Sequence, residues 1–151
     1  MTANAQSLAG RHALVTGGGR GIGAAIAAAL AGAGARVTLL ARNADELGAT
    51  AIAIGRTTVT VTADVTDPAQ VARAFVEARE AAGPIDILVN NAGLAKSRPL
   101  AKTDEDFWRA ILEVNLTGAY HCTRAALPAM LAANRGRIVN VASTAGLRGY
   151  A

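Results

Sequence analysis

The 151-residue sequence predicts an α/β fold built on a doubly wound parallel sheet. Short apolar segments alternate with longer segments of helical periodicity, and such alternation produces parallel sheets with helices on both faces. The apolar segments are continuous, as strands buried on both faces require. A glycine-rich stretch joins the first apolar segment to the first helix. The strand order expected for this kind of sheet is 3-2-1-4-5.

Nine elements are expected along the chain. The strands are predicted at residues 11–15, 36–41, 58–63, 85–89 and 137–142. The helices are predicted at residues 21–33, 43–54, 67–82 and 103–133. No linker or low-complexity tract divides these elements, so residues 1–151 are interpreted as one domain.

Local signals support each element in turn. The first helix carries Ile22, Ile26 and Leu30 on one face, at the spacing i, i+4, i+8. Hydrophobic runs form the second and fourth strands, and the third is rich in β-branched residues. Asp67 is a cap residue for the third helix and is followed by a first-turn proline. Pro128 is expected to bend the last helix or to mark its final turns.

The composition excludes several classes of protein. Hydrophobic residues make up 52% and charged residues 17%, which indicates a well-buried globular chain. No apolar run has the length of a membrane span, and the first residues do not resemble a secretion signal. The net charge is +4, but scattered arginines and 3% aromatic residues do not favour nucleic acid binding. Cys122 is the single cysteine, which fits a reducing compartment, and a cytoplasmic location is expected.

The glycine-rich stretch at residues 16–23 is the first candidate site. Between a strand and a helix, free backbone N–H groups and the positive helix end favour phosphate, and glycine lets it approach closely. The spacing of Gly17, Gly21 and Gly23 is G-x-x-x-G-x-G. Gly19-x-Gly21-x-x-Ala24 fits the usual dinucleotide pattern only in a degenerate form. A flexible turn that merely uses glycine is the alternative.

Further polar motifs follow the other strands. Ligands of such sheets bind beyond the carboxyl ends of the strands, at the point where the strand order reverses. Asp64-Val65 follows the third strand, Asn90-Asn91-Ala92-Gly93 the fourth, and Ser143 the fifth, while Asn115 lies within the last helix. Separately, these residues could be a solvated strand end, turn formers or a loop cap. Asn115 is a poor helix former, so a functional role is the better explanation for it.

Taken together, the motifs resemble the short-chain dehydrogenase/reductase family over residues 10–151. The resemblance implies a Rossmann-like fold and a site for NAD(P). It implies pyrophosphate and loop contacts by Gly17, Gly19, Gly21, Ile22 and Gly23, adenine contacts by Asp64 and Val65, and ribose contacts by Asn91, Ala92 and Gly93. It also implies two catalytic residues: Ser143 would bond the substrate oxygen, and Asn115 would hold a water in a proton relay.

The cofactor prediction depends on the end of the second strand. A carboxylate there would bind the adenosine ribose and repel a 2′-phosphate, but the sequence has Leu40-Ala41-Arg42. Arg42 and Arg20 could bind a phosphate through their guanidinium groups. NADP(H) is therefore favoured over NAD(H). The alternative is that both arginines are solvated surface charges.

The catalytic Tyr-x-x-x-Lys pair of the family is missing from the sequence. Tyr150 lies too close to Ser143, and the sequence ends at Ala151 without the lysine. The fifth strand would also be an uncovered apolar edge. The domain is therefore expected to be incomplete at its C-terminus and the 151 residues inactive alone.

Two functions remain open. The first is an NADP(H)-dependent reductase or alcohol dehydrogenase for a ketone such as a 3-oxoacyl thioester, with a homo-oligomer expected for the longer protein. The second is a nucleotide-binding module without catalysis, and retention of Asn115 and Ser143 favours the first. An adenosylmethionine site is disfavoured because the second strand lacks the ribose-binding carboxylate. No membrane partner and no metal ligands are expected.

Overall fold

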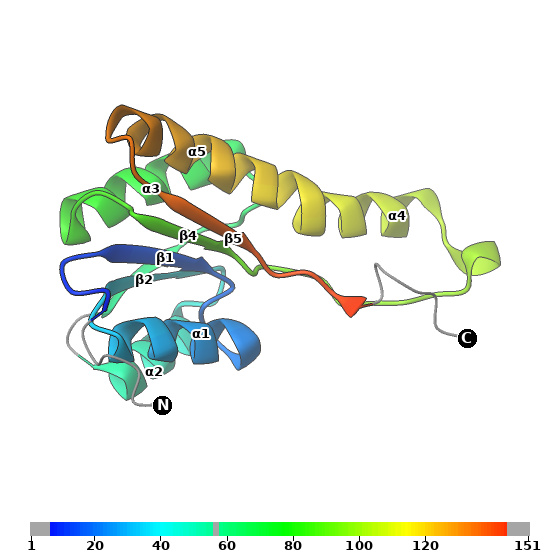
Figure 1. Ribbon diagram of the computed structural model, residues 1–151. Helices are drawn as coiled ribbons and strands as arrows, with labels where there is room; N and C mark the ends of the chain where they lie inside the picture. The colour runs from blue at the N-terminus through cyan, green and yellow to red at the C-terminus, as the bar shows by residue number, and fades with distance from the viewer. Residues whose placement is uncertain (1–6, 56–57, 145–151) are drawn as a thin grey trace.

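A five-stranded parallel sheet with the order β3-β2-β1-β4-β5 is the centre of the molecule (Figure 1). The computed structural model describes residues 7–55 and 58–144. The strands are β1 His12–Thr16, β2 Arg36–Ala41, β3 Thr58–Thr62, β4 Ile87–Asn90 and β5 Arg137–Asn140. All four pairings are parallel, which confirms the predicted fold class and strand order.

Helices cover both faces of the sheet. The helical elements are α1 Gly21–Gly32, α2 Ala44–Ile54, α3 Pro68–Ala82, η1 Leu100–Lys102, α4 Glu105–Leu112, η2 Glu113–Thr117 and α5 Gly118–Ala132. The pair α1 and α2 lies on one face, and α3 and α5 lie on the other (Figure 1). No helix in the described part of the chain is long and apolar enough to cross a membrane.

The two faces of the sheet explain the continuous apolar strands. Successive side chains of a strand point to opposite faces. Leu14 belongs to the core beneath α3 and α5, with Phe75 and Cys122. Its neighbour Val15 belongs to the core beneath α1 and α2, with Leu47. Every position of β1 is therefore buried.

The inner face of α1 consists of small residues. Gly23 and Ala27 are its buried positions, whereas Ile26 and Leu30 are only partly buried and Ile22 is exposed. A Cβ at Gly23 would collide with the carbonyl oxygen of Gly17. Because α1 approaches the glycine-rich loop so closely, its glycine and alanine positions face the core. The predicted apolar face of Ile22, Ile26 and Leu30 is therefore turned partly away from the core.

The long last helix is interrupted. It was predicted as one element over residues 103–133, but it consists of α4, the π-helical turn η2 and α5. A π turn holds one residue more than an α turn, so it changes which side chains face the sheet. Pro128 lies in the last turns of α5. The turn η2 contains Asn115, so this candidate residue sits at the irregular point of the helix.

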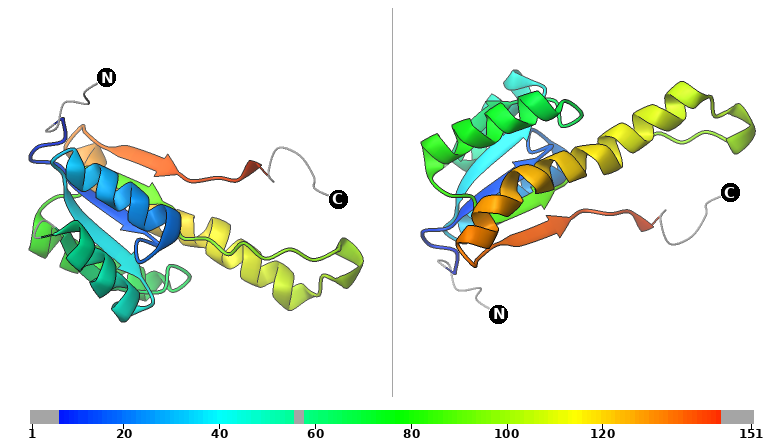
Figure 2. Two further views of the ribbon diagram at one scale, coloured as in Figure 1. Left: turned by 90° about the horizontal axis from the view of Figure 1, so that it is seen from below. Right: turned by 90° about the horizontal axis from the view of Figure 1, so that it is seen from above.

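The part of the molecule beyond the carboxyl ends of the strands, together with the edge strand β5, buries few residues. The segment before α4, and α4 itself, extend past the carboxyl ends of the strands (Figures 1 and 2). No residue of α4 is buried. The edge strand β5 ends at Asn140, two residues earlier than predicted, and Val139 and Val141 are exposed. The predicted uncovered apolar edge is therefore present among the described residues.

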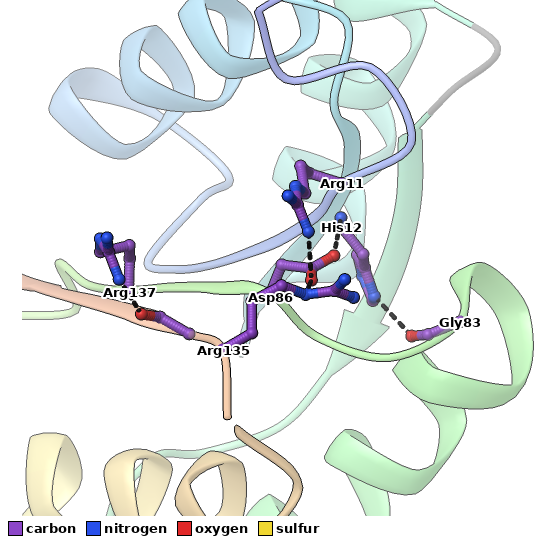
Figure 3. Close-up of polar contacts among 7 residues, drawn as sticks. Arg11, His12, Gly83, Asp86, Arg135 and Arg137 are labelled. Carbon is purple, nitrogen blue, oxygen red and sulfur yellow. Dashed lines mark hydrogen bonds and ion pairs between the residues drawn. The ribbon is translucent and has the colours of Figure 1, made fainter. Parts of the chain in front are cut away.

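The amino ends of three strands meet at Asp86 (Figure 3). Its nearly buried carboxylate accepts hydrogen bonds from the His12 backbone N–H at 3.0 Å and from Arg11 at 3.4 Å, and it forms an ion pair with Arg135 at 2.8 Å. The His12 ring is buried, with Nδ1 2.7 Å from the Gly83 carbonyl oxygen. This network ties the starts of β1, β4 and β5 together at the end opposite the candidate site.

Candidate functional site

A cleft of about 790 Å³ opens at the carboxyl ends of the strands. It is bordered by the loop before α1, the ends of β2, β3 and β4, and the start of α2. All twelve residues that the sequence proposed for cofactor binding line it. They are Gly17, Gly19, Arg20, Gly21, Ile22, Gly23, Arg42, Asp64, Val65, Asn91, Ala92 and Gly93.

The loop between β1 and α1 requires glycine at specific positions. Gly17 and Gly21 have φ angles of +64° and +55°, where other residues are strained. A Cβ at Gly17 would also come within 2.9 Å of the Asn91 amide nitrogen. At Gly21 a Cβ would meet nothing within 4 Å, so the loop there is bare and open. These glycines fix the curvature of the loop and leave room for a ligand beside its backbone.

The N-terminus of α1 differs from those of α2 and α3. In α2 and α3 the side chains of Asn43 and Asp67 accept hydrogen bonds from first-turn N–H groups. In α1 the cap residue is Arg20, which makes no capping hydrogen bond, and the first turn holds no acidic residue. The N–H groups and the positive helix end therefore remain available to an anion in the cleft. The residues present fit the pyrophosphate of a dinucleotide.

Thr16 joins the glycine loop to the end of β4. Its buried hydroxyl accepts hydrogen bonds from the backbone N–H groups of Asn91 and Ala92, both at 3.0 Å. The same hydroxyl donates to the Val89 carbonyl oxygen at 3.3 Å. The Asn91 amide donates to the Thr16 carbonyl oxygen at 2.9 Å. One side chain therefore sets the distance between two walls of the cleft.

The two arginines of the cleft are both exposed, and each is paired with a carboxylate. Arg20 lies 3.6 Å from Glu46, and Arg42 lies 3.7 Å from Asp64. All four side chains belong to residues that line the cleft. Exposed pairs at these distances are weak, so either guanidinium group can turn to a ligand.

Asp64 and Val65 form the wall beyond β3. The Asp64 carboxylate accepts hydrogen bonds from the Thr66 backbone N–H at 3.0 Å and hydroxyl at 2.8 Å. The Val65 carbonyl oxygen accepts from His121 Nδ1 at 3.1 Å. A Cβ at Gly118 would come within 2.7 Å of the Val65 side chain, so α5 packs closely behind this wall. The wall is held from two sides.

The two catalytic candidates do not line the cleft. The Asn115 side chain accepts a hydrogen bond from the Leu94 N–H at 2.7 Å and donates to the Leu94 carbonyl oxygen at 3.2 Å. It therefore fixes the chain next to Gly93, at the rim of the cleft. Ser143 lies beyond the end of β5 in an exposed segment. Tyr150, whose spacing from Ser143 does not fit the catalytic tyrosine of the family, lies outside the described residues.

Among the residues in and around the cleft that were not predicted as site residues, three make polar contacts with its walls. They are Thr16, Glu46 and Thr50, whose hydroxyl donates to the Gly19 carbonyl oxygen at 2.7 Å. Thr16 directly precedes the first glycine, and that position was a signal for it. Glu46 and Thr50 are one turn apart on α2, and their contact with the loop depends on the rotation of that helix.

Other reactive groups lie away from the cleft. Burial raises the pKa of the Cys122 thiol to about 12, so the thiol is un-ionised at neutral pH. Within residues 7–55 and 58–144 no group of three histidine, cysteine or acidic side chains could hold a metal ion.

The fold and the cleft together define a Rossmann-type α/β protein. A family model described as short chain dehydrogenase matches residues 11–151, and the chain belongs to that family of oxidoreductases. It is 40% identical over 150 residues to the 2-dehydro-3-deoxy-L-rhamnonate dehydrogenase (NAD(+)) of a Sphingomonas species. It is 39% identical over 142 residues to the 3-oxoacyl-[acyl-carrier-protein] reductase FabG of Escherichia coli.

A solved structure shows the same arrangement. Actinorhodin polyketide ketoreductase, in a crystal structure with NADPH, superposes with a TM-score of 0.89 at 35% identity. That match covers 99% of this chain and 58% of the ketoreductase. The two sequence relatives are matched over 99% and 93% of this chain, but over only 60% and 57% of their own length. The chain thus spans less than two thirds of the relatives that it matches.

Proposed function

We propose that the cleft binds NADP(H), and that the protein transfers hydride between the nicotinamide and a carbonyl or alcohol. The observation that carries the proposal is the joint presence, in one cleft, of an uncapped helix N-terminus and two arginines. The first suits a pyrophosphate, and the second suits an additional phosphate on the adenosine ribose. No carboxylate stands at Leu40-Ala41-Arg42, where an NAD-binding protein would use one.

Each part of the cleft has a role in this proposal. Gly17, Gly21, Ile22 and Gly23 hold the pyrophosphate through backbone N–H groups and close packing, and the contribution of Gly17 is the packing, because its N–H donates to the Leu40 carbonyl oxygen at 2.7 Å. Asp64 and Val65 border the adenine. Asn91, Ala92 and Gly93 border the ribose. Gly19 positions the neighbouring Arg20 to bind the 2′-phosphate. Arg42, at the end of β2, binds the same phosphate.

The chemistry needs a hydride and a proton. When bound, NADP(H) would supply hydride to a carbonyl carbon or would accept it from an alcohol carbon. Ser143 would donate a hydrogen bond to the substrate oxygen. Asn115 fixes the rim of the cleft through its hydrogen bonds with Leu94. Asn115 would also hold a water molecule that takes part in proton transfer. The 151 residues contain no tyrosine followed four residues later by lysine. We therefore expect this chain alone to bind the cofactor without turnover.

The substrate and the assembly belong to the same proposal. The Escherichia coli relative is a reductase of 3-oxoacyl groups on acyl carrier protein, which makes a ketone such as a 3-oxoacyl thioester a reasonable substrate class. Exposed apolar side chains on η2 and α5, including Leu116, Leu127 and Leu131, support a homo-oligomer of the whole protein. A cytoplasmic location is proposed from the single, buried cysteine.

Replacement of both arginines tests the cofactor assignment. Arg20→Asp combined with Arg42→Asp should weaken NADPH binding by about 100-fold, because two attractive charges become repulsive. NADH, which lacks the 2′-phosphate, should change far less. The matched control is Arg73→Asp with Arg124→Asp, which makes the same charge change at exposed positions that do not line the cleft. Unchanged NADPH affinity in the first double variant would refute the assignment.

A further inference from the structure

The start of α2 packs against the loop that carries Arg20. The Thr50 hydroxyl donates to the Gly19 carbonyl oxygen at 2.7 Å. A Cβ on Gly19 would lie 3.1 Å from the Glu46 Cβ, so the helix and the loop are in direct contact. Glu46 is therefore fixed close to Arg20 by the packing of its own helix.

The Glu46 carboxylate competes for the Arg20 guanidinium. Arg20 Nε and Glu46 Oε2 lie 3.6 Å apart, and the Arg20 and Glu46 side chains are 82% and 38% exposed. Both residues line the cleft. A phosphate that binds Arg20 must draw it away from this carboxylate and must also tolerate the negative charge beside it.

The second pair, Arg42 and Asp64, differs from the first. The Asp64 carboxylate is anchored by two hydrogen bonds from Thr66 and remains in place when Arg42 turns away. Asp64 also lies just after strand β3, whereas Glu46 lies on α2, the helix that packs on the glycine-rich loop. Glu46 is therefore the acidic group whose position is coupled to that of Arg20.

On the basis of the proposed function, we propose that Glu46 is a specificity-determining residue of the cofactor site. It holds Arg20 in the absence of a 2′-phosphate and lowers the preference for NADP(H) over NAD(H). The protein consequently discriminates less between the two cofactors than its pair of arginines alone would dictate. Removal of the carboxylate should increase the preference for NADPH.

The test is a double-mutant cycle with NADPH and NADH as the probes. Glu46→Gln keeps the size of the side chain and its packing on Gly19 but removes the charge. Dissociation constants are measured for the 151-residue chain, Glu46→Gln, Arg20→Gln and the double variant at low ionic strength. Glu77→Gln is the matched control, because Glu77 is an exposed glutamate on α3 outside the cleft.

The ratio of the two dissociation constants is the readout. Glu46→Gln should raise the preference for NADPH about fivefold, at the upper end for a surface ion pair. The increase should be absent in the Arg20→Gln background and in Glu77→Gln. An unchanged ratio in Glu46→Gln, or an equal increase without Arg20, would overturn the role of Glu46 while NADPH binding by the wild type stands. A wild-type chain that binds neither dinucleotide would instead overturn the proposed function and this inference with it.

Discussion

Thr16→Val removes the hydroxyl that joins the glycine loop to the end of β4. Valine has almost the shape of threonine, so the substitution leaves no cavity and changes only the hydrogen bonds. The backbone N–H groups of Asn91 and Ala92 lose their acceptor, and the Val89 carbonyl oxygen loses a donor. Thr16 is only 1% exposed, which prevents water from simply taking the place of the hydroxyl.

The contacts set the expected magnitude. A buried hydrogen-bonding group left without a partner costs about 1–3 kcal/mol. The two N–H contacts are at 3.0 Å and are expected to dominate, while the contact with Val89 is longer at 3.3 Å. Allowing for partial exposure of Asn91 and Ala92, the free energy of unfolding should fall by about 2–4 kcal/mol. That is a large part of the total stability of about 5–15 kcal/mol that is typical of a domain.

Urea denaturation followed by circular dichroism measures this free energy directly. Thr16→Ser is the matched control, because it keeps the hydroxyl and loses one methyl group, at a cost of about 1 kcal/mol. NADPH affinity should also fall in the valine variant, since Asn91 and Ala92 border the cleft. A valine variant as stable as the serine variant would show that the Thr16 hydroxyl does not link the two walls.

Four further predictions concern other positions in the chain. Gly23→Ala should destabilise the chain by about 1–3 kcal/mol and abolish NADPH binding, because its Cβ would collide with the Gly17 carbonyl oxygen. Gly48→Ala, where a Cβ meets nothing within 4 Å, should by contrast stabilise α2 by about 0.5–1 kcal/mol in the same urea titrations. Burial lowers the pKa of His12, so the unfolded chain binds a proton more readily than the folded chain does. The free energy of unfolding should therefore fall as the pH drops below about 6.5. Urea titrations at pH 7.5 and 5.5 should show a smaller fall in this free energy for His12→Gln than for the wild type. A thiol-reactive dye at pH 8 should label Cys122 only after unfolding, because its pKa is about 12 in the fold, and rapid labelling of the native chain would contradict its burial.

Much of the sheet was predictable from local patterns. The strand order followed from the alternation of elements and from the glycine loop after the first strand, since both specify a doubly wound sheet. The convergence of Asp64, Asn91 and the glycines followed from the common direction of parallel strands. The carboxyl ends of such strands lie at one edge of the sheet, whatever the details of packing.

The remaining features depend on contacts that the sequence pattern does not contain. The π-helical turn at Asn115 was missed because residues 103–133 carry helix-forming sequence throughout, and a π turn adds one residue without ending the helix. The contacts of Glu46 with Arg20 and of Thr50 with Gly19 depend on how α2 is rotated against the loop. The exposure of Ile22 follows from the close packing of Gly23, which is a three-dimensional constraint.

Mapping the site where a dinucleotide binds tests the assignment of the cleft. At 15.2 kDa, the ¹⁵N-labelled chain is suited to two-dimensional amide NMR during titration with NADP⁺. We expect the chemical shift changes to concentrate on the backbone amides of the cleft, while the amide signals of Arg73, Val76 and Glu77 on α3 stay in place. The amides expected to shift are those of Gly17, Gly19, Gly21, Ile22, Gly23, Arg42, Val65, Asn91 and Gly93. Shifts that centre elsewhere, or no shift at millimolar NADP⁺, would contradict the assignment of this cleft as the cofactor site.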